Sequence, residues 1–138
     1  MGKTSEQTVN INEVSRISSG TFVKGEIASQ NDIRIDGSFE GNLYSKGRVV
    51  IGENVVIKGE IICQNADLWG DFSGELHATD TLSLKAGCKM TGNVHVRRLQ
   101  VELGSVFNGN CNMLSADELD SVSAGLDKKL ASIQQEKE

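Results

Sequence analysis

Two histidines and three cysteines are the side chains of this 138-residue chain best suited to metal binding or nucleophilic chemistry. His77 and His95 are the only histidines, and they lie 18 residues apart. Imidazole is a common zinc ligand, but two ligands do not complete a site. Cys63, Cys88 and Cys111 are widely spaced and include no CxxC pair. We therefore expect free, buried thiols and neither a metal site nor a cofactor.

Two further motifs hint at catalysis or nucleotide binding. The segment from Ile51 to Cys63 has apolar residues six apart, as in the hexapeptide repeat of left-handed β-helix acyltransferases. This period fades on both sides, and no inserted loop could wall a substrate pocket. Gly2-Lys3-Thr4 lacks the upstream glycine and the strand-to-helix context of a phosphate-binding loop. A left-handed β-helix enzyme, of the acyltransferase or carbonic-anhydrase kind, stays an alternative, whereas nucleotide-driven activity is disfavoured.

The composition excludes several classes of protein. A net charge of -5 without a basic stripe argues against nucleic acid as a partner. No apolar run approaches the roughly 18 residues of a membrane span. Residues 1–19 lack the apolar stretch of a secretion signal, so we expect a cytoplasmic protein. The absence of proline and the 15 glycines favour stacked β-structure, because its ladders use the backbone N–H that proline lacks.

A repeat runs through residues 20–114. Six glycines recur at separations of 16, 18, 15, 18 and 17 residues. An apolar residue lies two positions before each glycine and another lies two positions after it, and Glu or Asn follows each glycine directly. These glycines are Gly25, Gly41, Gly59, Gly74, Gly92 and Gly109. Short segments that repeat in this way cannot bury their apolar faces alone, so they are expected to stack.

A second apolar pair recurs between the glycines, again with period two. It reads Ile33/Ile35, Val49/Ile51, Leu82/Leu84 and Leu99/Val101. Period two indicates strands with one buried face, and stacking them about 4.8 Å apart gives a β-solenoid of about six coils. By this alternation the three cysteines face inward. The histidines belong to an outer column that we expect to be a mixed surface: Ala28, Tyr44, Ile62, His77, His95 and Asn112.

The two flanks differ from the repeat. Residues 1–19 show no convincing period, and we expect a disordered arm. Residues 115–138 are rich in charged, helix-favouring residues, and apolar residues recur at three- and four-residue steps: Leu119, Val122, Leu126, Leu130 and Ile133. This pattern predicts a flexible or partly helical tail, which is either solvated or docked on the solenoid as a helix.

With the repeat in hand, a family resemblance becomes visible. The run DIRIDGSFEGNLYSKGRVVIGENVVIKGEI (residues 32–61) resembles the core of the bactofilins, bacterial cytoskeletal polymer-forming proteins. So does SLKAGCKMTGNVHVRRLQVELGSVFNGNCNML (residues 83–114), and the resemblance covers about residues 20–114. It implies an all-β fold, a single-stranded right-handed β-helix of triangular section, between flexible arms.

The same resemblance implies a function. It suggests nucleotide-independent assembly into filaments through the two ends of the solenoid, with a role in cell shape or in scaffolding cell-envelope enzymes. Such a protein would be cytoplasmic, or peripheral at the inner face of the cytoplasmic membrane. Many bactofilins are described as having a membrane-targeting N-terminus, but residues 1–19 have no large aromatic residue and no clear amphipathic face. We do not extend that feature to this chain.

An uncapped solenoid exposes apolar rungs and unpaired backbone groups at both ends. We therefore expect polymer contacts on the first coil, at Phe22, Val23 and Ile27, and on the last coil, at Val106, Phe107, Cys111, Met113 and Leu114. Phe107 is the expected anchor because of its apolar area. Ordinary core packing beneath a folded-back tail is the alternative for Phe107. A monomeric β-solenoid scaffold that displays its arms or outer columns to partner proteins is the alternative for the whole chain.

Overall fold

The computed structural model describes residues 14–136, which form one nine-stranded sheet followed by a single helix. The strands are β1 (Val14–Ile17), β2 (Phe22–Ser29), β3 (Asp32–Ile35), β4 (Ser38–Ser45), β5 (Arg48–Ile51), β6 (Val56–Leu68), β7 (Asp71–Leu84), β8 (Lys89–Val101) and β9 (Val106–Met113), and the helix is α1 (Ala116–Glu136). Within this described part, no helix is long and apolar enough to cross a membrane.

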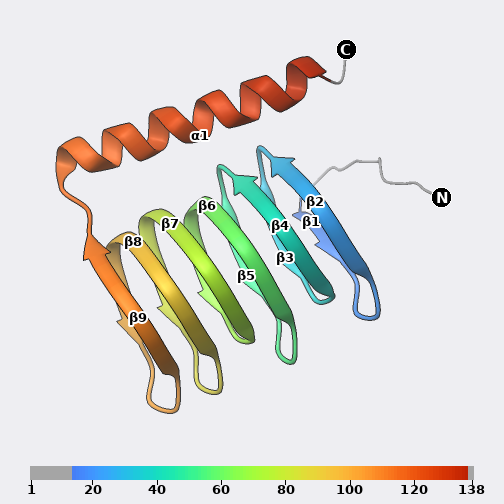
Figure 1. The fold of residues 1–138 in the computed structure, drawn as a ribbon, viewed down its shortest axis with the longest axis vertical. Coiled ribbons are helices and arrows are strands. Elements are labelled where there is room, and N and C mark those ends of the chain that lie inside the picture. Colours follow the sequence, from blue (N-terminus) through green and yellow to red (C-terminus); the bar gives the residue numbers. More distant parts are fainter. Residues whose placement is uncertain (1–13, 137–138) are drawn as a thin grey trace.

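The strands form six stacked coils, as the repeat predicts (Figure 1). Each coil combines a short strand segment with a long one, and every strand pairing is parallel. β6, β7 and β8 are longer because each runs on from one coil into the next: β6 pairs first with β4 and then with β5. The chain is therefore a β-solenoid in which each residue lies beside its equivalent on the next coil.

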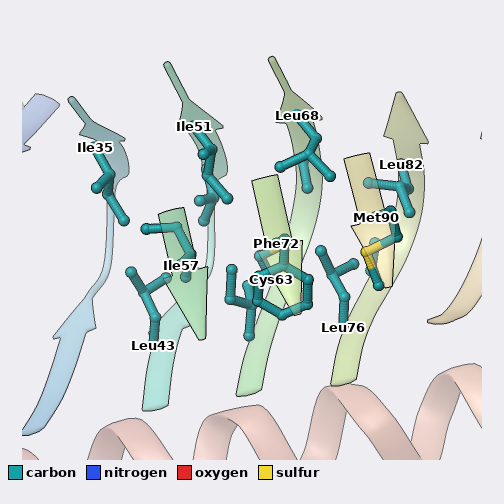
Figure 2. Close-up of a cluster of buried hydrophobic side chains, with 14 of the residues drawn as sticks. Ile35, Leu43, Ile51, Ile57, Cys63, Leu68, Phe72, Leu76, Leu82 and Met90 are labelled. Atoms are coloured by element: carbon teal, nitrogen blue, oxygen red, sulfur yellow. The ribbon is translucent and has the colours of Figure 1, made fainter. Parts of the chain in front are cut away.

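The interior is filled by columns of apolar side chains that run along the stack. One column reads Ile17, Ile35, Ile51, Leu68, Leu84 and Val101, and a second reads Val23, Phe39, Ile57, Phe72, Met90 and Phe107. Figure 2 shows Ile35, Ile51 and Leu68 on successive coils beside this second column. The middle members are almost completely buried, so the core is one continuous rod of side chains.

The motif glycines form a column of their own, and two constraints require them. All six have positive φ, between 128° and 150°, in a region that L side chains rarely adopt. A Cβ on Gly41, Gly59, Gly74, Gly92 or Gly109 would also collide with the carbonyl oxygen of the glycine one coil earlier. Each long strand therefore turns at a point where the backbones of successive coils touch directly.

β1 differs from the expectation for residues 1–19. Residues 1–13 lie outside the described part of the chain, but Val14–Ile17 pair in parallel with β3 and complete the first coil. Ile17 packs against the core, while Ser15 takes the position of the other apolar residue of the repeat. This polar substitution explains why the apolar pattern is weak at the first strand.

The residues after the solenoid form one continuous helix of 21 residues, which is the helical alternative that the sequence pattern leaves open for the tail. Ser115 and Glu118 form a capping box at its start. The Ser115 N–H donates to the Glu118 carboxylate at 2.8 Å, and the Glu118 N–H donates to Ser115 Oγ at 3.3 Å. From there α1 runs back along the side of the solenoid, from β9 toward β2 (Figure 1).

α1 docks on the outer column that was expected to be surface. Leu126 and Leu130 are buried against Tyr44 and Ile62, with Val122 beside them. Lys46 pairs with Asp127 at 2.9 Å, and the Lys129 ammonium lies 5.4 Å from the centre of the Tyr44 ring. Tyr44 and Ile62 point away from the core, as the alternation predicts, but the helix removes them from water.

The glycine column makes a direct prediction about stability. Gly74→Ala should destabilise the fold by more than about 3 kcal/mol, because backbone strain of about 1–3 kcal/mol adds to a collision with the carbonyl of Gly59. Gly25→Ala is the matched control, since Gly25 has the same φ of 135° as Gly74 but nothing within 4 Å of its added Cβ. Thermal unfolding followed by circular dichroism separates the two effects. Equal losses in both variants would show that the collision is not what requires glycine.

Docking of α1 makes a second prediction. Leu126→Ala should cost about 2–5 kcal/mol of packing energy, enough to detach a helix held by few buried residues. Hydrogen exchange of residues 116–136 should then become fast while β6 and β7 stay protected. Lys128→Ala, at an exposed position of the same helix, should leave exchange unchanged. Slow exchange of the helix in Leu126→Ala would show that this contact does not hold α1.

Candidate functional site: the two ends of the solenoid

The first end of the solenoid is formed by β1 and β2. Phe22 is 62 % exposed, whereas Val23 and Ile27 are partly buried and pack on the core. Their equivalents one coil later, Phe39 and Leu43, are fully buried. Val23 and Ile27 therefore point inward as predicted, and they keep an open side because no coil precedes them in the described chain.

The last end is formed by β9 and the end of β8. Val106 is 46 % exposed and Met113 is 54 % exposed. Phe107 and Leu114 are partly buried. Cys111 continues an inner column but is exposed, so the expectation that all three thiols are buried is wrong for this one. Cys111 is the last member of its inner column among the described residues, so no further coil covers its thiol.

Two apolar residues at the last end were not among the expected contacts. Val101 is 57 % exposed, although it ends the column of Ile51, Leu68 and Leu84. Leu103 is 96 % exposed, in the turn between β8 and β9. The alternating pattern places Val101 on the last coil, so its exposure could have been inferred. Leu103 lies in a turn, and the repeat pattern does not describe turn residues.

Both ends also present free strand edges. β1 and β2 pair only with β3 and β4, and β9 pairs only with β8, in the part of the chain that the structure describes. The helix leaves these edges open, since it contacts β2, β4, β6 and β7 from the side (Figure 1). An edge with unpaired N–H and C=O groups beside apolar side chains is a template for association with another chain.

A charged cluster fastens the first coil to the second. The Asp36 carboxylate accepts hydrogen bonds from Arg16 at 3.2 Å and from Arg34 at 2.9 Å. The Arg34 hydrogen bond is the main cause that lowers the pKa of Asp36, with the charges of Arg34 and Arg16 adding to it against partial desolvation. Because Arg16 belongs to β1, this carboxylate helps to hold the outermost strand in place.

The cysteines in the core are unsuited to chemistry. Burial raises the pKa of Cys63 to about 12, and burial also raises the pKa of Cys88. A nucleophilic or metal-binding cysteine needs the thiolate, which these surroundings disfavour. Both residues act as small apolar side chains that fill the inner columns.

Comparison with known proteins assigns this architecture to a family. Residues 15–112 match the family model of the bactofilins, which is described as polymer-forming and cytoskeletal.

The chain belongs to the bactofilin family.

Two bactofilins of Myxococcus xanthus are among its relatives. BacO is 29 % identical over 97 residues, which cover 70 % of this chain and 77 % of BacO. BacP is 24 % identical over 92 residues, which cover 67 % of this chain but 38 % of BacP. A structure of Thermus thermophilus bactofilin double helical filaments superposes with a TM-score of 0.63 at 23 % identity, over 72 % of this chain and 99 % of that one. The bactofilin resemblance and the solenoid fold are thus confirmed, and this is a cytoskeletal, polymer-forming protein.

The Asp36 cluster predicts how the first coil of this bactofilin responds to pH. A carboxylate with a lowered pKa in the folded state adds stability above its unfolded pKa of about 3.9, and loses it as the pH falls through the folded value. Asp36→Asn should therefore lower the free energy of unfolding at pH 7 by at most about 1 kcal/mol, because the arginines are exposed. At an acid pH below the lowered folded pKa of Asp36, the stabilities of the variant and the parent protein should converge. An equal difference at both pH values would rule out the charge as the cause.

Proposed function

We propose that this chain assembles end to end, without nucleotide, into cytoplasmic filaments that scaffold cell shape or cell-envelope proteins. The observation that carries the proposal is that, within residues 14–136, no coil covers the inner apolar columns at either end. Within the stack the same columns are sealed by the next coil: Phe72 and Met90 are buried, whereas Phe107 in their column is not.

The contact energy would come from the interaction that already holds the coils together. Full burial of a side chain such as Phe contributes about 1.5–3 kcal/mol, and several apolar residues lie together on each end face. The unpaired backbone groups of the edge strands would be satisfied in the same contact. Neither contribution needs a bound nucleotide, and the sequence has no phosphate-binding loop in a strand-to-helix context.

The relatives support assembly as the function. The solved bactofilin from Thermus thermophilus forms double helical filaments. Coverage of that whole chain by this fold suggests that the solenoid itself is the assembling unit. We extend the same mode of action to this chain, with its end faces as the contact surfaces: Phe22, Val23 and Ile27 on the first coil, and Val106, Phe107, Cys111, Met113 and Leu114 on the last.

Substitution at the last end tests the proposal. Phe107→Arg should abolish filaments, because it puts a charge into an apolar contact and removes several kcal/mol, which corresponds to a more than 100-fold higher critical concentration. Val56→Arg is the matched control: Val56 is 47 % exposed, but it lies on a central coil. High-speed pelleting and negative-stain electron microscopy, without nucleotide, measure the outcome. Filaments of unchanged length in Phe107→Arg would refute this contact.

The mass of the blocked species shows which ends meet. If the last end binds the first end of another chain, Phe107→Arg should be a monomer. If first ends bind first ends and last ends bind last ends, the unaltered first ends of two chains should still bind each other, and the variant should be a dimer. Analytical ultracentrifugation distinguishes the two. A parent protein that stays monomeric at high concentration would instead support the monomeric scaffold.

A further inference from the structure

The outer column on which α1 docks also contains a pair of stacked histidines. His77 on β7 and His95 on β8 are direct register partners on adjacent coils. Their rings are nearly parallel, at 8°, with centroids 4.4 Å apart. Asn112 follows on the last coil, with its side-chain amide 3.5 Å from Nδ1 of His95. The parallel stack therefore holds two imidazoles side by side.

A carboxylate completes a set of three possible ligands. Glu75 lies two residues before His77 on the same strand, so the alternation of the strand places both side chains on the same face. One ligand atom from each of Glu75, His77 and His95 lies within 4.8 Å of the other two. Nitrogen and oxygen ligands of zinc lie about 2.0–2.2 Å from the metal, hence roughly 3.3 Å from each other in a tetrahedral site. Rotation of the side chains alone can bring the ligand atoms from within 4.8 Å to this shorter separation, since Glu75 is exposed and both histidines are partly exposed.

The state of His77 suits it to be a ligand. Its Nδ1 is buried and has no hydrogen-bond partner among the described residues. A neutral imidazole has a free lone pair on one of its ring nitrogens, which is the group that binds a metal ion. The Tyr44 hydroxyl, in the same outer column, is the other buried side-chain polar atom without a partner among the described residues, and such atoms are rare enough to need an explanation.

The chemistry of the three groups selects the kind of ion. Two imidazoles and one carboxylate form a ligand set that zinc uses with one position left for water. Calcium and magnesium prefer six or more oxygen ligands, which this cluster does not offer. We infer that Glu75, His77 and His95 form a binding site for one zinc-class transition-metal ion on the outside of the solenoid. Such an ion links β7 to β8, and so ties two coils together through their side chains.

Equilibrium dialysis against zinc chloride, followed by metal analysis, tests the site. The protein carries no histidine tag, is first stripped with a chelator, and contains Cys111→Ser so that the exposed thiol cannot bind metal. Because the chain has no other histidines, any imidazole ligand must be one of these two. We expect one ion per chain with micromolar affinity, and visible absorption bands of tetrahedral cobalt when Co²⁺ replaces zinc.

Matched variants decide which residues hold the ion. His77→Ala and His95→Asn should each weaken binding by about 100-fold or more, since loss even of a supporting residue costs 10–100-fold. Asn112 is the register partner of His95 on the last coil, so this column already accommodates an asparagine. His95→Asn should therefore keep the fold. Glu75→Gln should weaken zinc binding by about tenfold or more. Glu26→Gln should not, because Glu26 is the register equivalent of Glu75 three coils earlier, away from the histidines.

Two results would overturn the inference. One is a parent protein that binds no zinc below millimolar concentration. The other is affinity that survives in His77→Ala and in His95→Asn, which would place the ion elsewhere. Circular dichroism and pelleting of each variant confirm that the fold and assembly are intact, so the outcome does not depend on whether the filament proposal holds.

Discussion

Each coil of this chain lies directly on the coil before it, residue beside equivalent residue, and the rest of the structure depends on this in-register stacking of backbones. The spacing of about 4.8 Å between strands leaves no room for a Cβ where the long strands turn, so glycine occupies that column on every coil. The same register aligns side chains into columns, and each inner column must be apolar along its whole length. It also brings Asp36 beside Arg16, and His77 beside His95, from positions far apart in the sequence.

The sequence predicts most of this because every coil meets the same requirement. Six glycines with apolar residues two positions to either side establish the strands, the inward faces and the number of coils. The pattern is weak at the first strand, where Ser15 replaces an apolar residue and only Ile17 continues its column. The repeat pattern does not describe turn residues, so it does not predict that Leu103, in the turn before β9, is exposed at the last end. The alternation of apolar and polar residues also shows which side chains point inward and which point outward. It does not show whether an outward column faces water or lies under a helix, so it does not predict the burial of Tyr44 and Ile62.

α1 adds contacts that the stack alone does not provide. Coils of a solenoid touch only their neighbours, so stability is nearly a sum of local terms. The helix is about 31 Å long at 1.5 Å per residue, close to the roughly 29 Å spanned by six coils. By packing on β2, β4, β6 and β7, it connects the end of the chain to its first coils. Burial of the Tyr44 hydroxyl, which has no partner among the described residues, opposes this docking. The helix is therefore held less firmly than the stack beneath it.

The two ends obey the same stacking rule but differ in chemistry. The first coil carries Arg16 and, in an inner column, Ser29, and Phe22 is its one large, strongly exposed apolar side chain among the described residues. The last coil exposes Val101, Leu103, Val106 and Met113. Among the described residues, the last coil therefore exposes more large apolar side chains to water than the first coil does. In the part of the chain that the structure describes, the repeat thus ends at the coil whose apolar side chains are least covered, because no further coil stacks on them.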